Sequence, residues 1–225
     1  MKTLKHILTF LILATFLTAC GGGEGGGSNS EVPPETQEFK NLEDQLSSIP
    51  EGSGESYSTT TSAGREWELD LVMNGNLSDS SEMERTAFNR SPRASNATIN
   101  ENNVQLSGQR GAVGTVSGNM NSTLGNSNFT VNITYSDFAH SRSLILKGSS
   151  VYTENISSIQ QTLHLTAALS ISGHFGAKMA YDLTVVGNAT HISVIGNALI
   201  ISGGNKYHCQ VAGPSSGDLF AALCE

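Results

Sequence analysis

Apolar and polar residues alternate along much of the chain after Val104, and this alternation predicts β-strands. It is clearest over residues 129–135, 163–171 and 177–185, where the odd-numbered residues are apolar and most even-numbered residues are polar. A period of two residues is typical of strands that bury one face of a sheet and expose the other. We therefore predict an all-β domain over residues 65–225.

Glycine-containing turns between the strands predict an antiparallel up-and-down meander of about eight or nine strands. The turns lie at residues 125–126, 173–175, 187–188 and 203–204. In a hairpin the numbers of paired residues sum to a constant that the turn sets. Taken in that order, the turns predict the pairs Val116 with Tyr135, Leu165 with Leu183, Tyr181 with Val194, and Ala198 with Cys209. Each pair places apolar or small residues opposite each other, so one face of the meander is continuously apolar.

The meander must bury this apolar face, and three arrangements do so. The sheet can close into a barrel, fold over as a sandwich, or be capped by helices. Gly and Ala recur on the apolar face beside larger residues, which leaves room for tight curvature or for an internal cavity. We predict an apolar cavity lined by six inward-facing residues: Leu165, Ala167, Met179, Tyr181, Val194 and Gly196.

The remaining segments give weaker signals. A short helix is expected over residues 37–46, with Phe39, Leu42 and Leu46 on one side, and a polar linker over residues 53–64. Residues 66–76 fit a strand that places Trp67, Leu69, Leu71 and Met73 on one face. We expect residues 78–103 to form a long loop or to contain a weak strand near residues 83–88, and residues 216–224 to form a short helical turn.

The first twenty residues carry a secretion signal. Two lysines precede an apolar stretch over residues 7–17, which is too short to span a bilayer comfortably. The stretch ends in Leu-Thr-Ala-Cys20 and is followed by Gly21, which resembles the lipobox of bacterial lipoproteins. The resemblance implies cleavage before Cys20, a diacylglycerol thioether on Cys20, an acyl chain such as palmitate on its new amine, and sorting to the outer membrane. The alternative is an ordinary signal peptide that leaves Cys20 as a free thiol.

A Gly/Ser/Pro-rich tether follows Cys20. Such a composition forms a flexible coil, which would hold the folded part clear of the lipid headgroups. Polyglycine at this position is similar to the tethers of surface-displayed lipoproteins. The expected organisation is a signal peptide (1–19), a lipidated Cys and tether (20–36), a short helix and polar linker (37–64), and the β domain (65–225).

The two other cysteines are expected to pair. Cys209 lies on the apolar face of the last long strand, and Cys224 follows a short apolar segment. Disulfides are usual in exported proteins, so we predict a Cys209–Cys224 bond, with two free buried thiols as the alternative.

Composition and charge narrow the choice of function. The chain of 225 residues has a net charge of −8, which argues against nucleic-acid binding. Serine, threonine and asparagine number 30, 19 and 18, and these polar residues supply most of the second face of the strands. No sequence motif of a nucleophile elbow, a zinc hydrolase or a phosphate loop occurs. His164 and His191 are expected on the polar face beside Thr184, too far apart to share a metal ion.

The sequence thus predicts a non-catalytic envelope lipoprotein without a cofactor or metal. Its β domain is expected to bind an apolar small molecule or lipid, because small residues recur on the inner face. The alternative is a structural or adhesive module on the cell surface that binds a protein or glycan through its polar Ser/Thr/Asn face. The protein partner and the side of the outer membrane that the domain faces stay open.

Overall fold

The computed structural model describes residues 34–54, 62–90, 96–106, 111–121, 125–141, 144–157, 159–187, 192–213 and 221–224. In these residues two helices precede nine strands. The helices are α2 (Gln37–Ser48) and α3 (Ser62–Arg90). The strands are β1 (Asn96–Gln105), β2 (Ala112–Asn121), β3 (Asn126–Ser141), β4 (Leu144–Ile156), β5 (Gln161–Gly173), β6 (Ala177–Gly187), β7 (Ile192–Ser202), β8 (Asn205–Ala212) and β9 (Ala221–Cys224).

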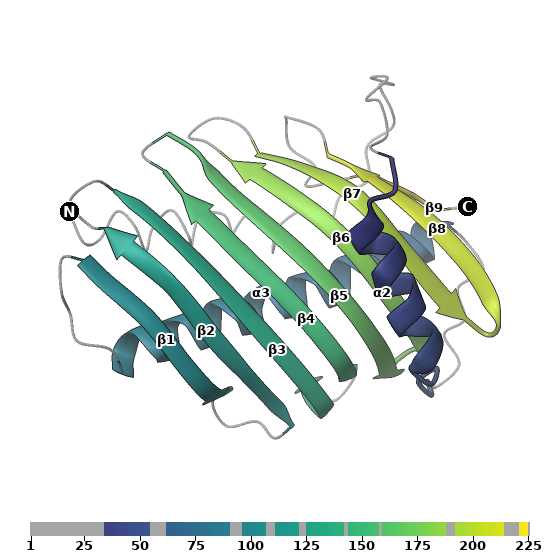
Figure 1. Cartoon of the computed structure of the whole chain (residues 1–225). Helices are drawn as coiled ribbons and strands as arrows, with labels where there is room; N and C mark the ends of the chain where they lie inside the picture. The colour runs from purple at the N-terminus through teal and green to yellow at the C-terminus, as the bar shows by residue number, and fades with distance from the viewer. Residues whose placement is uncertain are drawn as a thin grey trace.

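The strands form one antiparallel sheet in sequence order, β1 to β9, which confirms the predicted meander. Each strand pairs with its neighbours in the chain, and among the described residues β1 and β9 form the two edges. The sheet is therefore open rather than closed into a barrel, and helices cover it instead. Figure 1 shows the curved sheet with α2 in front of it and α3 behind it.

Two of the four predicted hairpin registers are confirmed. Leu165 pairs with Leu183, and Ala198 pairs with Cys209, as the turns predicted. The other two registers were wrong: the sums of the paired residue numbers differ from the predicted sums by four. Four residues, rather than two, connect β6 to β7, and four connect β2 to β3. The observed pairs are Tyr181 with Ala198 and Val116 with Val131. A shift of four keeps every side chain on its predicted face, because side chains in a strand alternate with a period of two.

The predicted strand over residues 66–76 was wrong, because these residues belong to the 29-residue helix α3. The same helix replaces the loop or weak strand expected after residue 78, and β1 follows it. The buried side chains of α3 recur at the helical spacing of three or four residues: Leu69, Val72, Met73, Asn76, Ser80, Met83 and Ala87. Polar residues among them conceal the helical pattern in the sequence. Neither described helix has the length and apolar composition needed to cross a membrane.

Helix α3 covers the inner face of the sheet and completes the main core. Leu69, Val72 and Met73 belong to the same buried cluster as the apolar side chains of β1 to β9. Glycines on this face have a backbone role. At Gly148 and Gly196 φ is +131° and +153°, and a Cβ atom would clash with carbonyl oxygens of the neighbouring strands. These glycines permit close, curved strand pairing.

Helix α2 packs on the outer face of the sheet and confirms the predicted short helix. Its apolar side chains Phe39, Leu42 and Leu46 form a second, smaller core. The partners from the sheet are Ala168, Ala180 and Leu199, on β5, β6 and β7. The small alanine side chains at outer-face positions leave space for the helix to approach the sheet.

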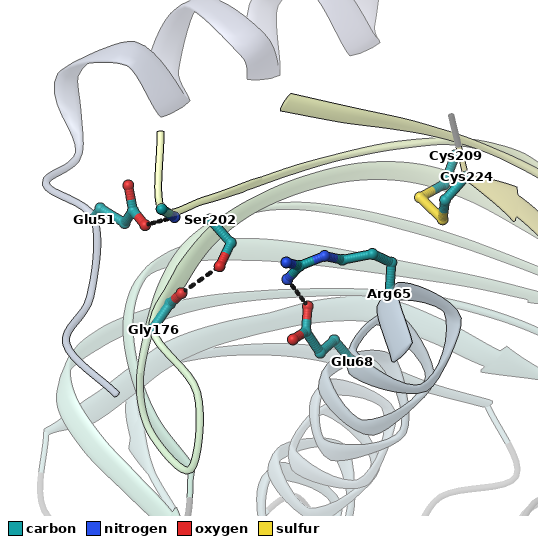
Figure 2. A network of polar contacts seen from close by, with 8 residues as sticks. Glu51, Arg65, Glu68, Gly176, Ser202, Cys209 and Cys224 are labelled. Carbon is teal, nitrogen blue, oxygen red and sulfur yellow. Dashed lines mark hydrogen bonds and ion pairs between the residues drawn. A yellow bond between two sulfur atoms is a disulfide. The ribbon is translucent and has the colours of Figure 1, made fainter. Parts of the chain in front are cut away.

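A short extended segment carries the chain from the outer face to the inner face. The amide of Gly52 donates to the carbonyl of Ala177 (3.3 Å), and the amide of Gly173 donates to the carbonyl of Ser53 (3.0 Å). The Glu51 carboxylate accepts from the amide of Gly203 (2.6 Å), beside Ser202 in Figure 2. Residues 49–54 therefore wrap around one end of the sheet and connect α2 to the region that leads to α3.

Residues 221–224, the described part of the predicted helical turn over 216–224, form a strand instead. Ala221–Cys224 forms β9, which pairs with β8 and places Cys224 opposite Cys209. The two cysteines form a disulfide, confirming the predicted pair (Figure 2).

Candidate functional site

The outer face divides into a covered part and an uncovered part. Helix α2 covers β5 to β7, whereas in the described residues no element packs over the outer face of β1 to β4. The exposed Lys147 lies on the outer face of β4 at one edge of the uncovered part. Beyond it, β2, β3 and β4 contribute twelve contiguous residues: Val113, Thr115, Ser117, Asn119, Asn128, Thr130, Asn132, Thr134, Ser149, Val151, Thr153 and Asn155. We call this set the neutral face, because it contains hydroxyls, amides and two valines but no ionisable group.

The side chains of the neutral face form rows that cross the strands. One row runs from Thr115 through Asn132 to Val151, and in it the Asn132 amide donates to the Thr115 hydroxyl (3.2 Å). Adjacent strands lie about 4.8 Å apart, so the rows present donors and acceptors at regular intervals. All twelve side chains are exposed or half-buried, and a ligand can therefore reach them without a rearrangement of the fold.

A groove of about 460 Å³ lies at one end of the neutral face. We call it the end groove. Its lining comes from the ends of β2 to β5 and from the β4–β5 turn: Asn119, Asn126, Ser127, Asn128, Asn155, Ile156, Ser157, Gln160 and Thr162. Its volume is within the range of small-molecule sites, about 300–1,000 Å³. Three of these residues, Asn119, Asn128 and Asn155, also belong to the neutral face, so the groove and the face are continuous.

A polar cluster fixes the N-terminus of α2 to the sheet. Asp182 accepts hydrogen bonds from His164 Nε2 (2.7 Å) and from the Thr36 hydroxyl (2.5 Å). Thr36 is also the N-cap, since its hydroxyl oxygen accepts from the amide of Phe39 (2.9 Å). At the other end of the helix, the Lys178 ammonium donates to the Leu46 carbonyl (3.1 Å), where a cation suits the helix dipole.

The electrostatics of this cluster follow from its contacts. The hydrogen bond to Asp182 raises the pKa of His164, although burial acts in the opposite direction. Burial alone would raise the pKa of Asp182, but the hydrogen bonds from His164 and Thr36 outweigh it and the pKa is lowered. The pair thus stabilises the fold most between the ordinary pKa values of the two groups, about 3.9 for Asp and 6.5 for His. Below this window the Asp182 contribution is lost, and above it the His164 contribution is lost.

The geometry of this cluster fits a hydrogen-bonded attachment of α2 better than a metal site or an activated nucleophile. Ligand atoms of Glu38, His164 and Asp182 lie within 4.8 Å of one another. However, the 2.7 Å between His164 and Asp182 is a hydrogen-bond distance, shorter than the roughly 3.3 Å between two ligands of a tetrahedral zinc ion. The Thr36 hydroxyl donates to the carboxylate and not to the imidazole, so His164 does not activate it as a nucleophile. The arrangement instead attaches α2 to the sheet.

A second polar network lies between α3 and the sheet. The Asn76 amide donates to the Tyr181 hydroxyl (2.8 Å) and accepts from the Ser150 hydroxyl (3.0 Å). The Tyr135 hydroxyl donates to the Asp79 carboxylate (3.1 Å). Burial raises the pKa of Asp79 to about 7, the Tyr135 hydrogen bond lowers it in part, and the charge of Glu82 raises it further.

Two further carboxyl groups and an ion pair extend this network. Burial, followed by the charge of Glu154 and a hydrogen bond with it, raises the pKa of Glu84 well above its ordinary value. Near the start of α3, Arg65 and Glu68 form a fully buried ion pair (2.6 Å), shown in Figure 2. The Arg65 guanidinium lies 4.4 Å from the centre of the Tyr207 ring. These partners hold α3 against the sheet in a fixed register.

The structure corrects the expected environment of His164 and the expected content of the inner face. His164 is not a simple solvent-facing residue, because Asp182 and α2 lie against it; it does pair with Thr184 as predicted. His191 and the lipobox Cys20 lie outside the described residues.

The six residues of the predicted cavity do face inward and are buried: Leu165, Ala167, Met179, Tyr181, Val194 and Gly196. However, the apolar side chains among them pack in one core with α3. Part of this helix, residues 66–76, was predicted to be a strand, so the helix was not expected on the inner face.

Sequence reasoning missed two features of the surface. The end groove depends on which turns meet at one end of the sheet, and no local signal gave this. Trp67 was expected inside the sheet, yet its side chain is 46% exposed on α3. It contacts His174 and Phe175 edge to face, with ring centres 5.8 and 6.1 Å away.

No family model, curated protein or solved structure matches this chain.

Proposed function

We propose that this protein is a lipid-anchored binding module of the cell envelope whose neutral face recognises an uncharged partner rich in hydrogen-bonding groups, namely a glycan. One observation carries the proposal. The inner face is packed against α3, whereas the uncovered outer face of β2 to β4 presents twelve contiguous residues without an ionisable group, with Lys147 at its edge. The available surface is therefore polar and neutral, and its chemistry selects the partner.

The composition of the neutral face favours a glycan over a protein. Protein interfaces draw most of their binding energy from Trp, Tyr and Arg, and the neutral face contains none of these. Its amides and hydroxyls can both donate and accept hydrogen bonds, which matches the hydroxyl groups of a sugar. Hydrogen bonds of this kind are each worth only about 0.5–1.5 kcal/mol, so an extended surface with many of them suits an extended glycan.

A charge placed on the neutral face tests this proposal. We expect the double variant Thr130→Arg/Asn132→Arg to bind immobilised neutral oligosaccharides at least about tenfold more weakly than the wild type, because two large cations would displace the hydrogen-bonding groups. The matched control is Gln210→Arg, an exposed position on the same side of the sheet but on β8. Equal glycan binding by all three proteins, or no binding by any of them, would contradict the proposal.

The second candidate is an apolar small molecule or lipid bound by the inner face beneath α3. The observation in its favour is that Asp79 and Glu84 at this interface have raised pKa values, so their ionisation weakens the attachment of α3. Uptake of an apolar fluorescent probe by the wild type, unchanged in the double arginine variant, would favour this candidate over the glycan proposal.

The membrane anchor rests on the lipobox resemblance. Replacing Cys20 with serine removes the only residue of this motif that can receive the thioether lipid, so we expect the protein to move from the membrane fraction into the soluble fraction. Fractionation of cells followed by immunodetection measures this. A Cys20→Ser protein that stays with membranes as completely as the wild type would show that lipidation is not the anchor.

A further inference from the structure

We infer that the end groove is the site where a neutral oligosaccharide is held, with the neutral face extending the contact. This inference rests on the proposed function and narrows it from a surface to a set of residues. The groove is a shallow, open depression at the end of the neutral face, so a ligand there contacts the ends of several strands at once while one side of it stays in solvent.

The lining of the end groove selects against charged ligands. None of its nine side chains is ionisable, so an anionic sugar would find no cation to pair with. The chain as a whole carries a net charge of −8, which repels anions further. Ile156 is the single aliphatic side chain of the lining, but carbon atoms of the polar side chains also contribute to its surface, which suits the mixed hydroxyl and C–H surface of a sugar.

The amide groups of the groove are available to a ligand. Within the described chain, the side chains of Asn126, Asn155 and Gln160 make no hydrogen bond to another residue. Each carboxamide offers two donor hydrogens and an acceptor oxygen. A sugar hydroxyl both donates and accepts, so several such amides around one groove can bind neighbouring hydroxyls at the same time.

The groove is also preorganised. The Asn128 side-chain oxygen accepts from the amide of Asn119 (3.0 Å), which fixes the orientation of the Asn128 side chain. The β4–β5 turn is closed by hydrogen bonds in both directions between Ser157 and Gln160: the Ser157 amide donates to the Gln160 carbonyl (2.8 Å), and the Gln160 amide donates to the Ser157 hydroxyl (3.1 Å). Fixed groups lower the entropic cost of binding a ligand.

Two aliphatic side chains suit the apolar C–H face of a sugar ring. Ile156 lines the groove, and Ile159 is 80% exposed in the same turn, directly before Gln160. An exposed isoleucine beside a polar groove has no role in the core of the fold. A sugar ring can cover such a side chain with its C–H groups while its hydroxyls bind the amides.

The spacing of the groove residues fits a chain of several sugar units. Asn119 pairs with Asn128, Asn128 with Asn155, and Asn155 with Thr162, so the four residues form one row across β2 to β5. The strand spacing of about 4.8 Å is comparable to the length of one sugar unit in an extended chain. Successive units can therefore meet successive strands.

Substitution of one groove asparagine, compared with one exposed amide outside the groove and the neutral face, tests the inference. Asn155→Ala removes an exposed amide of the groove, and Gln210→Ala removes an exposed amide of β8 on the same side of the sheet. We expect the full chain with Asn155→Ala to bind mannotriose, cellotriose or chitotriose, whichever the wild type prefers, about tenfold more weakly. Gln210→Ala should leave the dissociation constant of the trisaccharide unchanged.

The readout is the dissociation constant from calorimetry, together with chemical shift changes of the side-chain amides. Weakened binding in Asn155→Ala with retained binding in Gln210→Ala supports the inference. Equal binding by both variants, with loss in the double arginine variant, would overturn the groove site but leave the proposed function intact. Binding that the double arginine variant also retains would overturn both, as would a preference for sialylated or sulfated trisaccharides over neutral ones.

Discussion

Replacing Asp79 with asparagine should stabilise the folded protein by on the order of 4 kcal/mol above pH 8, and should change its stability little near pH 4. Asp79 lies at the interface between α3 and the sheet, where burial raises the pKa of its carboxyl group to about 7 from an ordinary value of 3.8. The folded protein therefore keeps this proton up to a higher pH than the unfolded chain does.

The sign of the effect follows from proton binding. Between pH 3.8 and about 7 the folded state binds more protons at Asp79 than the unfolded state does, so the free energy of unfolding falls as the pH rises. Above pH 7 both states have lost the proton and the full cost remains. Asparagine cannot ionise, and its side-chain oxygen can still accept the hydrogen bond that the Tyr135 hydroxyl donates.

Urea denaturation at pH 4, 6 and 8 measures this difference. The variant's advantage over the wild type should grow steadily across the series, and comparison at each pH cancels the contributions of other groups such as Glu84. Asp44→Asn, at an exposed position of α2, is the control for removing one carboxylate from an acidic protein. An advantage that does not depend on pH would show that Asp79 is not the titrating group.

Loss of the disulfide should have the second-largest effect. Cys209 and Cys224 are separated by 15 residues in sequence, and closing a loop of that length stabilises a protein by about 3 kcal/mol in the chain-entropy model. Cys224→Ser should therefore lower the free energy of unfolding by about that amount. The four-residue strand β9 also contacts α3, so its release would uncover the end of the main core.

Two measurements separate the bond itself from the serine substitution. Reduced wild type should unfold at the same urea concentration as Cys224→Ser, and the double variant Cys209→Ser/Cys224→Ser should match the single variant. If reduction leaves the wild-type unfolding curve unchanged, the disulfide contributes nothing to stability and the loop-entropy argument does not apply to this protein.

The strands could be predicted because their pattern is local. In β5 and β6 the apolar residue at every second position marks the inner face, and the turn at residues 173–175 is short enough to set the pairing of Leu165 with Leu183. For β6 and β7 the same alternation set the face but not the register, because a longer connection permits several pairings of equal parity. Periodicity alone therefore identifies a face, and turn length must be known to identify a partner.

Helix α3 could not be predicted because its buried side is only partly apolar. Asn76, Asp79 and Ser80 are buried among Leu69, Val72 and Met83. The partners of Asn76 and Asp79 include Tyr181 on β6 and Tyr135 on β3, far away in the sequence. Tertiary contacts of this kind leave no local trace in the sequence. The error also affected the function, since an apolar inner face without α3 suggests an empty cavity, whereas α3 makes it a packed core.

The same reasoning limits what sequence says about the candidate site. Thr130, Asn132 and Thr134 were correctly placed on the polar side of their strand, but covered and uncovered parts of that side look alike in sequence. Ala168 and Ala180 on β5 and β6 lie beneath α2, while Thr130 and Asn132 on β3 do not. Only the position of a helix some hundred residues earlier in the chain distinguishes the two parts.

The attachment of α2 to the outer face has a mechanical consequence. Any pulling force that arrives through the chain before Pro34 reaches α2 before it reaches the sheet. The helix is held by three apolar side chains and by hydrogen bonds at its two ends, whereas each long strand is held by a ladder of backbone hydrogen bonds. Under force, α2 should detach before the strands separate. The detached helix adds length to the connection, so the sheet and its neutral face stay folded while the chain before them extends.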